Sequence, residues 1–384
     1  MLVHLSPDQE SLRDSTARFL ADKATPAALR SLRDDPAGFD AEYWRQGVQL
    51  GWTPLLVDPA HGGGSVSGNG LVDLTLIAYE FGRHAAPGPL LVNAVVAGAL
   101  SRHGGHQDVV DGLLTGERLA TWALHDARAG QAGDRRVTVR RDGNDLVLSG
   151  VKRPVESASR SNQLLVVARS TGAQRSEGAT PELTQVLVPA DADGLSFTPM
   201  FSVDLTRRFD VVTFDDVRVP KDSIVGEFGA AGYDVEHQLL QALVISAAES
   251  VGAMQAAFDM TLEWTHDRYS FGRPLASYQA IKHRMAAMKT WLEAAHAITD
   301  EAAESGSAKL AAAAAAYVGE QGSELMHECV QFHGGIGVTY EHDLHLFLRR
   351  HTLNRASYGT PGSHRQRVAA AVAAEASVRE QIPA

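Results

Sequence analysis

Apolar positions recur at helical spacing through the first third of the chain. Leu12 and Phe19 follow this period after Ser6-Pro7, where a capping serine and a proline in the first turn are typical of a helix start. Residues 71–81 and 90–103 repeat the helical pattern. We therefore expect an N-terminal helical domain over residues 1–117.

The pattern changes from helical to alternating near residue 117. Short segments rich in β-branched residues follow one another, with polar and apolar positions alternating along each segment. Asp142-Gly143 is a two-residue signal for a β-hairpin. These segments predict a β domain, barrel-like in outline, over residues 118–228.

Helical periodicity returns after Gly226-Glu227 and continues to the C-terminus. The pattern predicts one helix over 233–271, a second over 280–304, a third over 308–335 and a last one after Pro361. Four long helices joined by short loops are typical of a bundle. The predicted fold class is therefore α+β, with a C-terminal four-helix bundle over residues 229–384 that follows the helical and β domains.

Composition narrows the class of protein. A chain of 384 residues, 44% hydrophobic and 21% charged, is long enough for several packed domains. Its net charge of −11 argues against nucleic-acid binding, which needs a basic face. The lone Cys329 cannot form an internal disulfide, so we expect a cytoplasmic protein. The first residues lack the pattern of a signal peptide, and we expect no membrane span.

Residues 267–285 combine an arginine, an aromatic residue, a Gly-x-Pro break and a glutamine at fixed distances. The planar fork of Arg268 suits phosphate oxygens, and Gln279 can add an amide contact. Phe271 precedes the glycine of the break. A plain alternative is that Arg268 is a solvated charge at a helix end. The spacing favours a diphosphate contact only in combination with a second motif.

The second motif is His-Gly-Gly-Ile-Gly at the end of the third predicted helix. Its glycines allow the backbone to approach a ligand closely, although a glycine run can equally end one helix before the next. The candidate binding residues are Gly334, Gly335 and Gly337 of this motif, together with Gln331, two residues before it.

The order of these domains and motifs resembles the acyl-CoA dehydrogenase family along essentially the whole chain. The segment FDDVRVP at the end of the β domain also matches. The resemblance implies FAD as cofactor, an acyl-CoA substrate oxidised to a 2-enoyl-CoA, and an electron-transfer flavoprotein or similar acceptor. It also implies a homo- or heterotetramer in which the two motifs reach the FAD of a neighbouring subunit.

The resemblance also locates the catalytic base, and here the chain departs from the family pattern. Tyr358 stands where most members carry a glutamate, and Ala242 stands at a second family position for the base. Tyrosine is a poor base near neutral pH. Glu249, two helical turns after Ala242, is the remaining catalytic candidate, although a structural hydrogen bond is an open alternative. Thr360, in the segment after Tyr358, is a candidate FAD contact.

Several family contacts to the flavin ring are missing as well. His125, Pro154 and Glu156 replace residues that would bond or pack on the ring, and Leu243 replaces an arginine near the substrate. Three interpretations remain open. The chain is a dehydrogenase of bulky or branched acyl-CoA thioesters, as in steroid catabolism and lipid metabolism, or the non-catalytic subunit of a heterotetramer, or a member diverted to other flavin chemistry.

Histidines raise the question of a metal site. His342 and His345 have ligand-like spacing, but no third ligand converges on them in the sequence. We therefore predict no metal.

Overall fold

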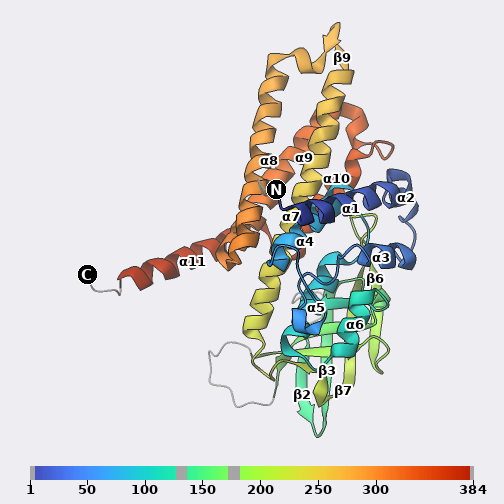
Figure 1. Ribbon diagram of the computed structural model, residues 1–384, viewed down its shortest axis with the longest axis vertical. Helices are drawn as coiled ribbons and strands as arrows, with labels where there is room; N and C mark the ends of the chain where they lie inside the picture. The colour runs from blue at the N-terminus through green and yellow to red at the C-terminus, as the bar shows by residue number, and fades with distance from the viewer. Residues whose placement is uncertain (1–4, 127–135, 172–181, 381–384) are drawn as a thin grey trace.

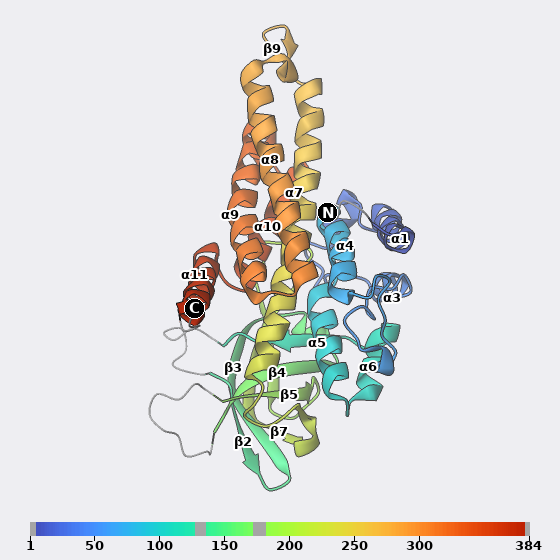
Figure 2. The same cartoon turned by 60° about the vertical axis from the view of Figure 1, so that its left-hand side comes forward.

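The computed structural model describes residues 5–126, 136–171 and 182–380. A long helical bundle forms one end of the molecule, a β-sheet lies at the other end, and the N-terminal helices pack along one side (Figures 1 and 2). The predicted fold class is confirmed by this arrangement, with helical N- and C-terminal regions around a middle sheet.

The N-terminal region is helical, and its first helix begins where the sequence predicts. The Ser6 side chain accepts a hydrogen bond from the Gln9 backbone at 3.2 Å, and the Gln9 side chain accepts from the Ser6 backbone at 3.0 Å. This reciprocal pair is a capping box. The helices are α1 (Pro7–Lys23), α2 (Pro26–Ser31), α3 (Ala41–Val48), α4 (Gly70–Arg83), α5 (Leu90–His103) and α6 (Gln107–Thr115).

The middle region is an eight-stranded sheet with strand order β6-β7-β3-β2-β4-β5-β8, and β1 pairs in parallel with β4. The predicted hairpin is present, because Asp142 at the end of one strand pairs with Asp145 at the start of the next. The strands are β1 (Ala120–Ala123), β2 (Thr138–Asp142), β3 (Asp145–Glu156), β4 (Gln163–Ser170), β5 (Leu183–Pro189), β6 (Leu195–Met200), β7 (Phe209–Pro220) and β8 (Ile224–Val225).

Up to residue 380, where the described part of the chain ends, the C-terminal region holds five α-helices, one more than the sequence predicts. They are α7 (Gly232–Asp267), α8 (Gln279–Ser305), α9 (Ala308–His333), α10 (Leu344–Ser357) and α11 (Pro361–Glu380), with the short hairpin of β9 (Tyr269–Ser270) and β10 (Arg273–Pro274) between α7 and α8. The sequence pattern did not predict helix α10, because this helix buries Arg350 and His351 beside its leucines.

Helix α7 is the central helix of the bundle. Among the described residues it alone is long and apolar enough to cross a membrane, but 83% of its most apolar window is buried inside the protein. Its apolar surface is therefore covered by other helices of the chain, as expected for a core helix.

Two glycines allow α4 and α7 to cross closely. A Cβ atom at Gly252 would lie 1.9 Å from the Tyr79 carbonyl oxygen, and one at Gly82 would lie 1.8 Å from the Glu249 carbonyl oxygen. Both distances are too short for carbon, so these positions require glycine. The crossing buries the segment of α7 that carries Glu249.

Candidate functional site

The first group of predicted residues lies at the far end of the bundle, which we call the bundle tip: the end of α7, the β9–β10 hairpin, the start of α8 and the loop after α9. Arg268 ends α7, and its backbone N–H donates to the Trp264 carbonyl oxygen at 2.9 Å. Phe271 lies in the hairpin turn with a φ of 51° and is 97% exposed. A left-handed, exposed phenylalanine is unusual, and such strain is often found where a side chain contacts a ligand or partner.

The glycine-rich loop after α9, η5 (Gly334–Val338), is fixed beside the last turns of α7. The Trp264 indole N–H donates to the Phe332 carbonyl oxygen at 3.1 Å, and the indole stacks on the His333 ring at 5.1 Å. A Cβ atom at Gly337 would lie 2.8 Å from the Cβ of His333, so the loop can fold this way only with glycine there.

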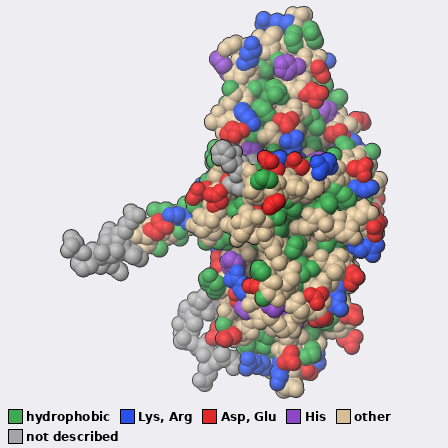
Figure 3. Space-filling view, viewed as in Figure 1, with side chains coloured by type: hydrophobic (Ala, Val, Ile, Leu, Met, Phe, Trp, Pro, Cys, Tyr) green, Lys and Arg blue, Asp and Glu red, His purple; other side chains and the backbone are tan. Residues whose placement is uncertain are grey.

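The two motifs therefore meet at one end of the bundle. Basic side chains gather there in the space-filling view (Figure 3). Gly337 is buried, whereas the side chains or backbone of the other predicted tip residues are exposed: Arg268, Phe271, Gln279, Gln331, Gly334 and Gly335. Among the described residues, no carboxylate forms an ion pair with Arg268. The tip thus offers a free guanidinium, amides and open backbone, which is the donor set that a diphosphate requires.

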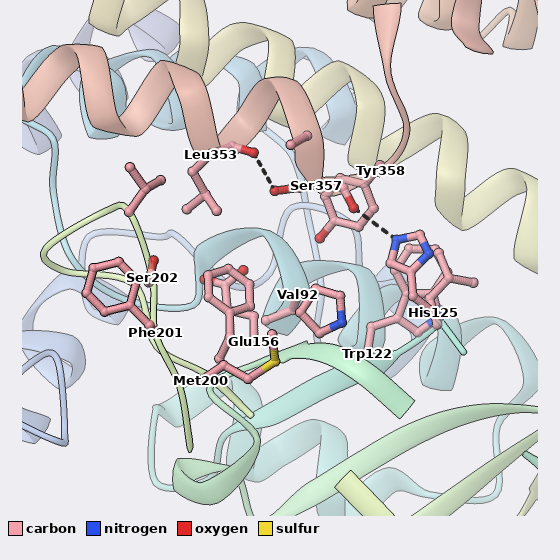
Figure 4. Close-up of a pocket in the computed structure, with 15 residues that line it drawn as sticks. Val92, Trp122, His125, Glu156, Met200, Phe201, Ser202, Leu353, Ser357 and Tyr358 are labelled. Carbon is pink, nitrogen blue, oxygen red and sulfur yellow. Dashed lines mark hydrogen bonds between the residues drawn. The ribbon is translucent and has the colours of Figure 1, made fainter. Parts of the chain in front are cut away.

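A second group of residues surrounds a cavity of about 200 Å³ between the sheet and the bundle (Figure 4). We call it the Tyr358 pocket. Its walls come from α5, the ends of β1 and β3, the segment after β6, and the end of α10. The lining residues include Val92, Trp122, Leu124, His125, Pro154, Glu156, Met200, Phe201, Leu353 and Tyr358.

Three side chains shape the wall of this pocket beneath α10. The His125 Nε2–H donates to the Ser357 carbonyl oxygen at 2.9 Å, and the Tyr358 ring stacks on Trp122 with centroids 6.1 Å apart (Figure 4). Burial raises the pKa of the Tyr358 hydroxyl, so it stays protonated near neutral pH. Tyr358 is therefore no base in this pocket.

Glu249 lies on α7 behind the pocket, and both of its carboxylate oxygens are engaged. Oε1 accepts from the Arg207 guanidinium at 2.5 Å and from the Arg350 guanidinium at 2.7 Å, while Oε2 accepts from the Asn354 amide at 2.9 Å. The residue is only 4% exposed. To act on a substrate, this carboxylate would first have to break its contacts with the two arginines.

The same two arginines bind further carboxylates. Arg207 also pairs with Glu156, and Arg350 pairs with Asp204 at 2.6 Å. Burial raises the pKa of Glu156 even though Arg207 opposes this effect. At Asp204 burial also acts to raise the pKa, but Arg350 outweighs it and holds the value below its usual range. We call this set the buried ion cluster; it joins the sheet to α7 and α10.

The predicted site residues thus fall into two separate groups. Arg268 follows Glu249 by 19 residues along α7, which corresponds to roughly 28 Å at 1.5 Å per residue. Thr360 follows Tyr358 by two residues but does not line the pocket: its hydroxyl accepts from the Ser363 backbone N–H at 3.2 Å at the start of α11. Side chains at the bundle tip therefore cannot line this chain's own Tyr358 pocket.

Sequence reasoning missed Arg207, Arg350 and Asp204. Arg207 precedes β7 and Arg350 lies on α10, 42 and 101 residues from Glu249. No local spacing links positions so far apart. A signal was present only in α10, where Arg350 interrupts a run of leucines at a position that the helix buries.

The fit of FAD differs between the two groups. The bundle tip has the donors for a diphosphate, as described above. The Tyr358 pocket is small for the flavin ring: its volume is about 200 Å³, and a cavity of about 150 Å³ holds a single benzene ring. In addition, the carboxyl of Glu156 in its wall is held in place by Arg207.

The two histidines with ligand-like spacing have other contacts. The His342 ring packs against His333 with centroids 4.5 Å apart, and His345 stacks on Tyr340. Among the described residues, no group of three or more histidine, cysteine or acidic side chains could hold a metal ion.

Family models match most of the chain. The acyl-CoA dehydrogenase N-terminal domain matches residues 6–108, and the acyl-CoA dehydrogenase C-terminal domain matches residues 230–373. Acyl-CoA dehydrogenase IpdE2 of Mycolicibacterium smegmatis is 26% identical over 374 residues, which cover 96% of this chain and 100% of the relative.

Solved structures agree with this family. A variant of the Tcur3481-Tcur3483 steroid ACAD has a TM-score of 0.84 and 28% identity, covering 96% of this chain and 99% of that one. A chain of the ChsE4-ChsE5 complex of Mycobacterium tuberculosis has a TM-score of 0.84 and 22% identity, and the match covers 100% of this chain and 100% of that one. At this identity the likeness supports the fold alone. This chain belongs to the acyl-CoA dehydrogenase family of oxidoreductases.

Proposed function

We propose that this chain is the subunit of a heteromeric acyl-CoA dehydrogenase that completes the FAD site of a different, catalytic chain. Its bundle tip binds the diphosphate and adenosine end of the partner's FAD, and its own Tyr358 pocket binds no flavin. When bound, FAD supplies the hydride acceptor of the reaction; this chain supplies contacts that hold the dinucleotide in place.

The observation that best supports this proposal is the size and lining of the Tyr358 pocket. Its volume of about 200 Å³ is small for a flavin ring, its tyrosine stays protonated, and the nearby Glu249 already binds two arginines. A reaction centre would need a ring-sized cavity and a free base within hydrogen-bond reach of the substrate.

The bundle tip supports the other part of the proposal, that this chain contacts FAD held by a partner chain. Arg268 has no ion-pair partner among the described residues, and Phe271 is almost fully exposed. Roughly 28 Å of α7 separates Arg268 from Glu249, which lies behind the chain's own pocket. An exposed cation, aromatic ring and glycine loop at that distance favour a ligand held by another chain.

The competing function is catalysis by this chain with Glu249 as base. That role stays a prediction, and it carries a cost: Glu249 would have to leave Arg207 and Arg350, and each of these buried arginines would lose one of its two carboxylate partners. We therefore favour a structural role for Glu249.

The acyl group and the electron acceptor belong to the same proposal. The structural relative at 28% identity is described as a steroid ACAD, which favours a bulky acyl-CoA substrate for the assembly. We further propose an electron-transfer flavoprotein or similar acceptor, a heterotetramer, and a cytoplasmic location.

Absorption spectra of the purified protein test the proposal. The chain expressed alone should lack the yellow flavin spectrum, and coexpression with its catalytic partner subunit should give a yellow complex. Arg268→Ala should lower the flavin content of that complex several-fold, because a charge-assisted phosphate contact is lost. Arg365→Ala, an exposed arginine of α11 paired with Glu320, is the matched control and should leave flavin content unchanged.

Two outcomes would refute it. A yellow chain that, alone, is bleached by an acyl-CoA would establish a reaction centre of its own. Full flavin content in the Arg268→Ala complex would remove the assigned role of the bundle tip.

A further inference from the structure

A second cavity, of about 360 Å³, lies between α5, the first turns of α7 and the segment 55–58. We call it the α5–α7 cavity. Its volume falls within the usual range of small-molecule sites, about 300 to 1,000 Å³. None of its lining residues belongs to the bundle tip, the Tyr358 pocket or the buried ion cluster.

Two side chains at this cavity, His237 and Arg102, have hydrogen-bond donors without a partner among the described residues. Gln241 donates its amide N–H to His237 Nε2 at 3.2 Å, so the proton of the neutral imidazole is on Nδ1. Burial, followed by the charge of Arg102, lowers the pKa of His237 and keeps it neutral. Arg102 is exposed at the cavity and has no ion-pair partner among the described residues.

Each of the two acidic groups at the cavity contacts one neighbour through its side chain. Asp234 accepts from His103 Nε2 at 3.1 Å, and Asp58 accepts from the Ala60 backbone N–H at 2.8 Å. The amide of Gln238 donates to and accepts from the amide of Gln185. Arg102 and the Nδ1–H of His237 have no partner among the described residues, and such donors suit a ligand with acceptor oxygens.

The opposite wall is apolar. Leu55, Val57 and Ala99 line it, each less than 10% exposed. A purely polar anion such as inorganic phosphate would leave this wall uncovered, whereas a hydrocarbon body would bury it. A cation would meet Arg102.

We propose that the α5–α7 cavity binds a small carboxylate with a short hydrocarbon body, its oxygens accepting from Arg102 and His237. This site is separate from the proposed contact with FAD, and the inference does not depend on that proposal.

Titration calorimetry with sodium hexanoate, and with hexanamide as its uncharged match, tests the site in the purified full chain. Hexanoate should bind at least tenfold more tightly than hexanamide, because hydrogen bonds to a charged partner are the stronger ones. Arg102→Gln should weaken hexanoate binding by a similar factor, and His237→Gln by a smaller one. Arg118→Gln, an exposed arginine of another surface paired with Asp108, should bind hexanoate like the unaltered protein.

Circular dichroism melting checks that each variant is folded. Equal affinity for hexanoate and hexanamide, or hexanoate binding that survives Arg102→Gln, would overturn the site. A chain that is colourless alone and fails to bind hexanoate overturns this inference only; a chain that carries its own flavin overturns the proposed function only.

Discussion

Glu249 connects parts of the chain that are far apart in sequence. Arg207 reaches it from the loop before β7, and Arg350 and Asn354 reach it from α10. Arg350 also donates to the Ala85 carbonyl oxygen at 3.0 Å, at the end of the N-terminal helices. One carboxylate thus helps to hold the helical, β and bundle regions together. This structural role is enough to explain why the glutamate is buried, and no catalytic role is needed.

This role predicts how Glu249→Gln behaves. The substitution keeps the shape of the side chain but removes the anion that two buried guanidinium groups share, although Glu156 and Asp204 still pair with them, so it should lower the free energy of unfolding by about 2 kcal/mol. Urea unfolding followed by circular dichroism measures the change. A catalytic base would instead give a folded protein of normal stability that has lost activity.

Glu236→Gln is the matched control on the same helix. Glu236 forms an exposed ion pair with Arg367 at 2.6 Å, and its loss should change stability by no more than about 1 kcal/mol. Equal effects of the two substitutions would contradict the structural role of Glu249.

The candidate residues differ in how far the sequence could place them. The sequence could indicate the Arg268 motif and the glycine loop because the residues of each lie close together in the chain, so that their spacing alone limits how far apart they can be. Glu249 was placed on the correct helix, but its partners come from segments that only the folded chain brings near. The periodicity of a helix predicts which face is buried, not which distant charge will meet it.

At the scale of elements, the crossing of α4 and α7 sets the position of the buried ion cluster. Gly82 and Gly252 let the two helices approach until backbone atoms are almost in contact. This close approach places the buried turn of α7 next to the end of α4, where the Ala85 and Ala86 carbonyl oxygens accept from Arg350.

Gly252→Ala should therefore destabilise the chain despite the higher helix propensity of alanine. The new methyl group would lie 1.9 Å from the Tyr79 carbonyl oxygen, so the helices must separate, at a cost of about 2 kcal/mol or more. Gly232→Ala at the start of α7, where no atom lies within 4 Å, is the control and should change the free energy of unfolding by less than about 0.5 kcal/mol. A thermal or urea unfolding curve that is the same for both variants would contradict the tight crossing.

Helices with a clear apolar period were predictable, and α10 was not. The sequence places α7, α8 and α9 within a few residues of their true ends, because each shows one apolar face. Helix α10 buries charged and apolar side chains together, which the pattern cannot distinguish from a polar loop. Its burial makes sense only once the acidic partners of Arg350 are known.

At the scale of the whole molecule, Glu80 makes stability depend on pH. Its side chain is buried in α4, and burial raises its pKa to about 7. Because the folded pKa lies above the unfolded value of 4.5, the folded state binds the proton more tightly, and this contribution to stability is lost as the pH rises through 7.

Glu80→Gln should remove this loss. Between pH 5 and pH 8 the contribution of Glu80 to the free energy of unfolding should fall by about 2 kcal/mol, whereas the glutamine variant carries no ionisable group there. Urea unfolding at the two pH values, with Glu236→Gln as a variant that keeps the original pH dependence, measures it. A glutamine variant with the same fall would contradict the buried, protonated state of Glu80.

The length of α7 between the bundle tip and the Tyr358 pocket also affects how a holoprotein of this kind would behave on dilution. If the nucleotide is held partly by one polypeptide and partly by another, its release is coupled to dissociation of the two chains, and mass action governs both. Loss of colour should then become more extensive as the protein concentration is lowered, unlike in an enzyme that encloses its cofactor within a single chain.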